Sequence, residues 1–215
     1  MEQVRAVIFD FDFTLADSSL GVFECINSGL KALGLEPATY EEVCTTIGLS
    51  LPETLVALKG EEANELSRRF HMHFLRNADE VMVDLTKVYP ETAGTLQYLK
   101  GRGYQVGVAS TKYRYRIESI LKRDGLLGLF DAIIGGEDVT EHKPNPECLE
   151  KTATILGIDR SHCVYIGDNR VDGEAARRAG IPFIATLTGF TPLEDLKAFE
   201  PIAIIEDLSQ LNQFL

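Results

Sequence analysis

A chain of 215 residues can hold one α/β domain with a smaller insertion, and its hydrophobic content of 45% suffices for a full core. Its 33 acidic residues outnumber its 21 basic ones, and the net charge of −12 argues against a nucleic-acid partner, which selects a basic surface. No apolar run reaches the length of a membrane span, and the first ten residues lack the apolar stretch of a signal peptide. We therefore expect a cytoplasmic protein that binds neither nucleic acid nor membrane.

Short apolar runs recur along the chain and predict buried parallel strands. They are Val4 to Phe9, 105–109, 132–134, 163–166, 183–185 and 202–205. Helical patterns lie between them, and most stop at a glycine. These patterns cover 90–100, 113–122, 146–156 and 172–179. The alternation of strand and helix predicts a doubly wound parallel sheet, an α/β core of the Rossmann-like kind.

The segment 18–84 interrupts this alternation, because it contains no strand-like run. Its helical patterns cover 18–33, 40–47, 52–58 and 61–77. We expect an inserted all-helical cap, residues 18–84, on a catalytic core made of residues 1–17 and 85–215. We also expect this cap to lie over the strand ends, where a lid excludes water and carries selectivity.

Cysteine spacing gives no sign of a zinc site or a disulfide framework. None of the four cysteines forms a CxxC pair, and Cys163 lies inside an apolar run. We expect reduced, buried thiols at Cys25, Cys44, Cys148 and Cys163.

Two aspartates follow the first predicted strand. Asp10 and Asp12 would point to opposite faces inside a strand, so at least one must lie beyond the strand's end if both serve one site. The carboxyl end of a parallel strand is where ligands bind in open α/β sheets. Two neighbouring carboxylates repel each other, and a divalent cation relieves that repulsion.

A second acidic group follows the strand predicted at 163–166. Asp168 comes just after Gly167, again at a strand end, and a plain structural role does not explain it well. Asp172 is placed where the next helix begins, so it also suits a helix cap. Carboxylates from two strand ends form a hard oxygen site, which predicts Mg²⁺ as the cofactor.

Two further groups suit the binding of a phosphoryl group. Ser110 and Thr111 end the strand predicted at 105–109, where hydroxyl and backbone N–H groups can hold phosphoryl oxygens. Lys143 precedes Pro144-Asn145-Pro146, which fixes the backbone of a strand-to-helix joint. A lysine there, facing several aspartates, is interpreted as a charge clamp for phosphate.

Four blocks together carry a resemblance to a known family. They are Asp10-Phe11-Asp12-Phe13-Thr14-Leu15, Val108-Ala109-Ser110-Thr111, Lys143-Pro144-Asn145-Pro146 and Ile166-Gly167-Asp168-Asn169-Arg170-Val171-Asp172. With their order and spacing, the chain resembles the haloacid dehalogenase-like hydrolases over nearly its whole length. Within that superfamily it is similar to the phosphoglycolate phosphatase-like branch, whose members carry a helical cap.

The resemblance implies a role for each main residue. Asp10 is the nucleophile that forms an aspartyl-phosphate, and Asp12 is the acid and then the base. Ser110 orients the phosphoryl group, and Lys143 stabilises its charge. Mg²⁺ is held by Asp10, by the backbone carbonyl of Asp12 and by Asp168. Further residues expected around the metal or the substrate are Thr14, Thr111, Asn169, Asp172, Gly48 and Leu49.

Two departures from the family pattern bear on selectivity. Phe13 stands where the family usually has glycine, so a positive φ there would strain the backbone. We expect Phe13 to change the local flap or the cap contact, and with it the choice of substrate. Ser110-Thr111 replaces a frequent Thr-Asn and leaves the role of Thr111 open. The predicted cap loop at Gly48 and Leu49 has no basic residue, which disfavours a mutase that must hold a bisphosphate.

The function predicted is a Mg²⁺-dependent phosphatase that hydrolyses a small phosphorylated metabolite resembling phosphoglycolate, as a monomer or homodimer. Alternatives within the superfamily are a sugar-phosphate mutase, a pyrophosphatase and a phosphonate hydrolase, the last of which needs a cap lysine. A dehalogenase is disfavoured, because Asp12 has no task in that chemistry. The alternative of another class is a catalytically silent binding protein, against which the intact set of acidic and basic residues argues.

Overall fold

The structure is a computed structural model that describes residues 4–215, and the chain divides into two compact units. The core unit contains the residues up to Ala16 and from Val88 to Leu215, and the helical unit contains Asp17–Lys87. The expected bounds fell after residues 17 and 84, and the observed units join after Ala16 and Lys87. Two-residue strands, β2 (Ala16–Asp17) and β3 (Lys87–Val88), pair at these two joins.

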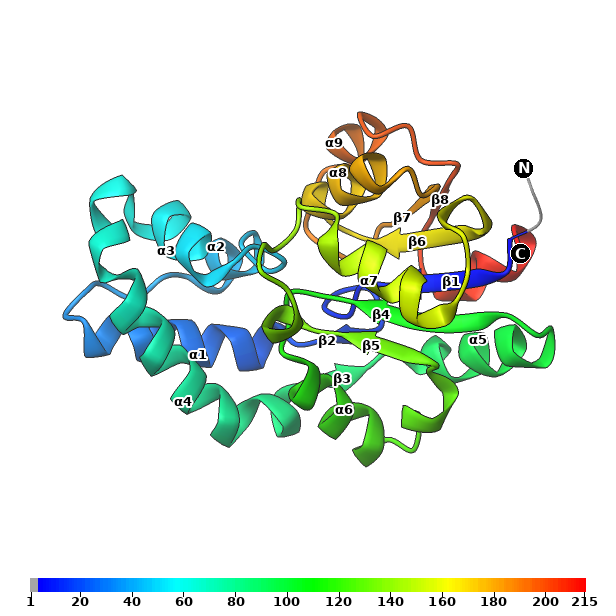
Figure 1. Ribbon diagram of the computed structural model, residues 1–215. Helices are drawn as coiled ribbons and strands as arrows, with labels where there is room; N and C mark the ends of the chain where they lie inside the picture. The colour runs from blue at the N-terminus through cyan, green and yellow to red at the C-terminus, as the bar shows by residue number, and fades with distance from the viewer. Residues whose placement is uncertain (1–3) are drawn as a thin grey trace. The chain divides into compact units, whose positions relative to one another are not determined.

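The core unit is built on a six-stranded sheet in the order β5-β4-β1-β6-β7-β8, and all its neighbouring strands run parallel (Figure 1). The strands are β1 (Ala6–Phe9), β4 (Gln105–Ala109), β5 (Ala132–Ile134), β6 (Cys163–Gly167), β7 (Phe183–Thr186) and β8 (Ala203–Ile205). Every residue of β1 and β6 is buried, which explains their continuous apolar runs. The predicted Rossmann-like sheet is confirmed.

The order of the strands reverses beside β1. The chain passes from β1 outward through β4 to β5, and then returns to β6 on the opposite side of β1 before it continues to β7 and β8. Such a reversal leaves a crevice at the carboxyl ends of the central strands, where ligands of doubly wound folds bind. The residues that follow β1, β4 and β6 therefore lie at this crevice.

Helices cover this sheet. Helix α7 packs against β1, β4 and β5, α8 packs against β6 and β7, and α5 contacts β4 (Figure 1). Left-handed glycines at positions 157 and 180 end α7 and α8, as their sequence patterns predicted. The helices of this unit are α5 (Pro90–Gly101), α6 (Arg114–Arg123), α7 (Glu147–Leu156), α8 (Arg170–Ala179) and α9 (Leu193–Lys197).

Short 3-10 helices complete the core unit. They are η2 (Leu127–Leu129), η3 (Gly136–Asp138), η4 (Arg160–His162) and η5 (Leu208–Gln213). Neither these turns nor the five-residue α9 could be predicted, because elements so short leave little periodicity in the sequence.

The helical unit is all-helical apart from the ends that it shares with β2 and β3. Its elements are α1 (Ser19–Ala32), α2 (Tyr40–Cys44), α3 (Leu51–Lys59), the 3-10 helix η1 (Glu61–Leu66) and α4 (Ser67–Leu85). Helix α1 packs along α4, and the buried face of α4 carries Phe70, Phe74, Ala78 and Met82. The single helix predicted at 61–77 was wrong at its start, which is a 3-10 helix, and too short at its end.

The four cysteines are free and buried, as expected. Among residues 4–215, no helix combines the length and the apolar character that a membrane crossing requires.

Candidate active site

The central strands deliver their following residues to one edge of the sheet. Phe9 at the end of β1 is in register with Val108 of β4 and with Ile166 of β6. The backbone N–H of Asp10 then donates to the carbonyl of Ile166 over 2.8 Å. Because parallel strands end on the same side, the residues after β1, β4 and β6 meet there, and these belong to three of the four sequence blocks. The fourth block, residues 143–146, precedes α7.

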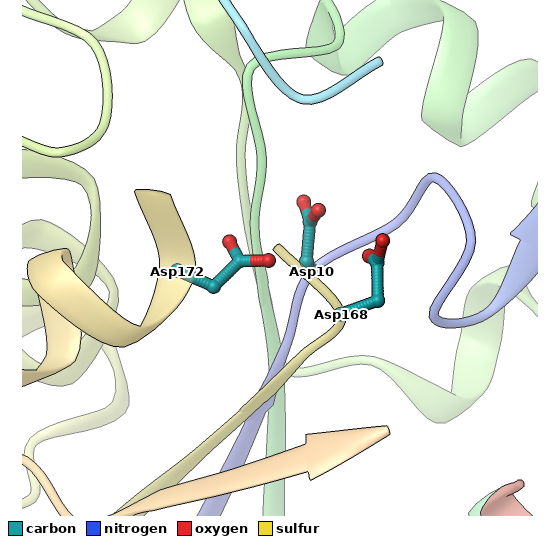
Figure 2. A group of neighbouring side chains, drawn as sticks. All are labelled: Asp10, Asp168 and Asp172. Carbon is teal, nitrogen blue, oxygen red and sulfur yellow. The ribbon is translucent and has the colours of Figure 1, made fainter. Parts of the chain in front are cut away.

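Three carboxylates gather at this edge. Asp10 follows β1, Asp168 follows β6, and Asp172 lies in the first turn of α8 (Figure 2). One carboxylate oxygen from each lies within 4.8 Å of one from each of the others, and all three side chains are buried. The predicted convergence of Asp10 and Asp168 is therefore present in the structure.

Lys143 places one positive charge among these carboxylates. Its Nζ lies 2.9 Å from Oδ1 of Asp10 and donates to Oδ1 of Asp172 over 2.6 Å. The side chain is fully buried, which opposes its charged form, but the Coulombic attraction of Asp10 and Asp172 outweighs this and raises the pKa of Lys143 above its ordinary value. Lys143 therefore stays protonated and faces the predicted nucleophile.

Tyr165 supports this lysine, and the sequence analysis did not identify it. Its hydroxyl accepts from Nζ of Lys143 over 3.0 Å and lies 2.9 Å from Oδ1 of Asp172 and 3.0 Å from the carbonyl of Ala109. Burial and the nearby carboxylates raise the pKa of Tyr165 well above its usual value, so the phenol keeps its proton. A tyrosine inside a strand is normally a core residue, and no sequence signal distinguishes this one.

The carboxylates carry more negative charge than the lysine compensates. Burial, with the charges of Asp172 and Asp12, raises the pKa of Asp10 to about 6 despite the opposing attraction of Lys143. Burial and the charges of Asp172 and Asp10 also raise the pKa of Asp168 well above its usual value. Nζ of Lys143 lies 2.9 Å from Oδ1 of Asp10 but also pairs with Asp172, so one ammonium group does not balance the charge of the cluster. Buried carboxylate oxygens with such a deficit fit a hard divalent cation such as Mg²⁺.

Asp172 is a less available ligand than Asp10 and Asp168. Its Oδ1 receives Lys143 and Tyr165, and its Oδ2 accepts the backbone N–H of Asn169 over 2.9 Å. Asn169 is the N-cap of α8, and its side chain accepts the backbone N–H of Val171 over 3.3 Å. These contacts give Asp172 the task of holding Lys143 and the helix start, and they make Asn169 a capping residue.

The turn after Asp10 contains the anticipated departure from the family pattern. Phe13 adopts φ 59°, the left-handed conformation that favours glycine, so its backbone is strained. Its carbonyl accepts from the hydroxyl of Thr188, and its ring centroid lies 5.3 Å from that of Phe190. Thr14 donates to Oδ1 of Asp168 over 3.2 Å, so the same turn contacts the carboxylate cluster. The effect of Phe13 on substrate choice stays a prediction.

Gly189 is a second residue that the sequence did not reveal. A methyl group on its Cα would overlap the carboxylate of Asp168. Glycine is therefore required where the segment after β7 passes over Asp168, and Thr188 beside it fixes the Phe13 turn. A lone glycine between two predicted elements gives no sign of this contact in the sequence.

The second residue of the acidic pair is placed differently from the first. Both carboxylate oxygens of Asp12 accept from Nζ of Lys112, over 2.9 Å and 3.2 Å. The side chain of Asp12 is thus directed to Lys112, and the metal contact expected through its backbone carbonyl stays a prediction. The sequence analysis did not name Lys112, although it lies only two positions after Ser110.

The remaining predicted residues occupy two regions. Ser110 is buried after β4, and its Oγ accepts the backbone N–H of Lys112 over 3.3 Å. Thr111 lies beside it in the same turn. Gly48, with φ 101°, and Leu49 lie between α2 and α3 of the helical unit, and their contact with a substrate stays a prediction.

The chain is similar to known proteins along most of its length. The family model described as haloacid dehalogenase-like hydrolase matches residues 7–186. This chain belongs to the haloacid dehalogenase-like hydrolases. The hydrolase is 36% identical to a phosphoglycolate phosphatase of Aquifex aeolicus over 88% of each chain. It is also 30% identical to the pyrophosphatase PpaX of Bacillus velezensis, over 98% of this chain and 95% of the relative.

A solved structure extends the likeness to the fold. The crystal structure of a haloacid dehalogenase-like hydrolase from Bacteroides fragilis matches this hydrolase with a TM-score of 0.93. The two sequences are 38% identical, and the match covers 97% of this chain and 100% of the other. The resemblance identified from the four sequence blocks is therefore confirmed at the level of the family.

Proposed function

We propose that this hydrolase is a Mg²⁺-dependent phosphatase that cleaves a small phosphomonoester through an aspartyl-phosphate at Asp10. The observation that carries the proposal is the setting of Asp10, which is buried with the ammonium group of Lys143 2.9 Å from its Oδ1 and with a carboxylate oxygen of Asp168 within 4.8 Å. A phosphoglycolate-like ester is the substrate that the Aquifex aeolicus relative suggests.

The residues divide the reaction into two phosphoryl transfers. In the first, an oxygen of Asp10 attacks phosphorus, the ester P–O bond breaks, and the carboxyl group of Asp12 gives its proton to the departing alkoxide. In the second, the carboxylate of Asp12 takes a proton from water as the water oxygen attacks phosphorus and the bond to Asp10 breaks. Lys143 and the hydroxyl of Ser110 hold the phosphoryl oxygens during both transfers.

The metal fits the carboxylate cluster. Asp10 and Asp168 would hold Mg²⁺, with the backbone carbonyl of Asp12, while Asp172 would stay engaged with Lys143. When bound, Mg²⁺ supplies charge neutralisation for the phosphoryl oxygens and for the attacking carboxylate. This division of tasks leaves the positive charge of Lys143 available to the substrate as well.

The test is phosphate release from a panel of phosphorylated metabolites, with and without Mg²⁺, by the wild type and by Asp10→Asn. We expect release that requires Mg²⁺ and that Asp10→Asn reduces by at least about 10³-fold, because an amide is a poor nucleophile. Asp159→Asn, at the exposed N-cap of η4, is the matched control and should retain wild-type turnover. Turnover by Asp10→Asn equal to that of the wild type would contradict the mechanism.

Pyrophosphate is the second candidate substrate, which the likeness to PpaX favours. Its hydrolysis uses the same nucleophile and the same cation, but the leaving group is phosphate itself. A panel that includes pyrophosphate beside phosphoglycolate separates the two candidates by their kcat/KM values.

A further inference from the structure

Lys112 forms a buried ion pair with Asp12, and the reaction described above gives Lys112 itself no task. Its Nζ donates to both oxygens of Asp12, and the side chains of the two residues are 4% and 9% exposed. A buried ion pair rarely stabilises a fold, because desolvation of two charges offsets their attraction. Stability alone therefore does not account for the buried pair of Lys112 and Asp12, and its place beside the predicted nucleophile suggests a role in the reaction.

The position of Lys112 links two parts of that site. Its backbone N–H donates to Oγ of Ser110 over 3.3 Å, and its ammonium group lies 5.9 Å from the ring centroid of Phe11. The backbone of Lys112 is therefore tied to the residue expected to orient the phosphoryl group, while its side chain is tied to the expected proton donor.

The two lysines of the site have different partners. Lys143 contacts Asp10 and Asp172, whereas Lys112 contacts Asp12 through both carboxylate oxygens. A lysine that mainly held phosphate would direct its donors at the space in front of Asp10. Nζ of Lys112 instead contacts both oxygens of Asp12, which holds that carboxylate toward the turn after β4.

We propose that Lys112 is a positioning residue that fixes the orientation of the Asp12 carboxyl group for proton transfer. The inference rests on the proposed function. In the first transfer, the proton passes from the Asp12 carboxyl oxygen to the ester oxygen as the P–O bond breaks, and the carboxylate left behind returns to the ammonium group of Lys112. Lys112 itself gains and loses no proton.

The test compares leaving groups in Lys112→Met, which keeps an unbranched side chain one atom shorter and removes its charge. An alkyl leaving group requires the proton of Asp12, whereas 4-nitrophenolate departs without one. We expect kcat for the best alkyl phosphate of the panel to fall about 10- to 100-fold, with KM changed by less than about threefold, as for a misplaced catalytic group. The burst of 4-nitrophenolate, measured by stopped flow, should keep a rate within about threefold of the wild type.

Two controls separate positioning from folding. The amplitude of the burst counts competent sites, so misfolded protein lowers the amplitude and leaves the rate unchanged. Lys122→Met, at an exposed position of α6, should match the wild type with both substrates.

A second comparison tests whether Lys112 acts through Asp12. In an Asp12→Asn background, Lys112→Met should change kcat by less than about twofold, because the group that it positions is gone. An equal loss of rate with both leaving groups would overturn the inference. So would a further tenfold loss of kcat when Lys112→Met is added to Asp12→Asn. In either case phosphate release by the wild type would still uphold the proposed function. A wild type that cleaves no phosphate ester would overturn both.

Discussion

At the scale of single residues, the site is organised by how buried charges are matched. Three carboxylates share one ammonium group in the cluster around Asp10, whereas Asp12 has a lysine of its own. Burial is the largest cause of the raised pKa of Asp10 and of Asp168, and the neighbouring carboxylate charges add to it. The same imbalance makes the cluster a candidate cation site, and the pair of Asp12 and Lys112 lies outside it.

The hydroxyl of Tyr165 provides a test of this matching. Tyr165→Phe removes a hydrogen-bond partner of Lys143 and of Asp172 from a fully buried network. We expect the free energy of unfolding in urea to fall by roughly 1–3 kcal/mol, the usual cost of leaving buried polar groups unsatisfied, and kcat to fall more than KM changes. Tyr104→Phe, at a half-buried tyrosine of the same unit, is the control. A Tyr165→Phe protein as stable and as active as the wild type would show that Lys143 is held without it.

At the scale of elements, the sequence predicted most strands because a strand buried on both faces leaves a continuous apolar run. The strand at Gln105–Ala109 was bounded correctly, and the helices ending before Gly157 and Gly180 ended where predicted. The helix expected at 61–77 was less accurate, because a 3-10 helix and an α-helix share one amphipathic pattern across their junction. The alternation of these strands and helices then predicted the doubly wound parallel sheet.

The site could be predicted only as far as its motifs follow strand ends. Asp10, Ser110 and Asp168 meet because their strands are neighbours, and neighbouring parallel strands are a property of the fold. Lys112, Tyr165 and Gly189 act through contacts between distant segments, and such contacts leave no pattern in one sequence. The resemblance to a family identified the motif residues, and only the structure revealed the residues that contact them.

The packing of α1 on α4 provides a prediction at this scale. A Cβ added at Gly29 would lie 2.8 Å from the ring of buried Phe70, so Gly29→Ala forces the two helices apart. We expect the melting temperature to fall, because overpacking costs about 1–3 kcal/mol and exceeds the roughly 1 kcal/mol that alanine contributes to a helix. Gly94→Ala, at an exposed position of α5 with open space around it, should raise the melting temperature instead. A stabilised Gly29→Ala protein would contradict this account of the packing.

At the scale of the whole molecule, the proposed mechanism makes protons and Mg²⁺ compete for the same buried carboxylates. Folding raises the pKa of Asp10 from 3.8 to about 6, so the metal-free folded state binds more protons than the unfolded state between these values. The contribution of this group to stability is therefore fully present below about pH 4 and is lost as the pH rises through about 6. Mg²⁺ binds the ionised carboxylate, so it acts in the range where the proton has left.

We therefore expect the rise in melting temperature caused by added Mg²⁺ to be small at about pH 5 and to grow up to about pH 7.5, because binding to the folded state stabilises it by mass action. The measurement is thermal unfolding with and without Mg²⁺ across this range, at constant ionic strength. In Asp10→Asn, added Mg²⁺ should raise the melting temperature less at every pH. This increase should also depend less on pH, because the titrating carboxyl group of Asp10 is gone. A rise in the wild type that is the same at both ends of the range would mean that Mg²⁺ binds away from Asp10, and the carboxylate cluster would then need another explanation.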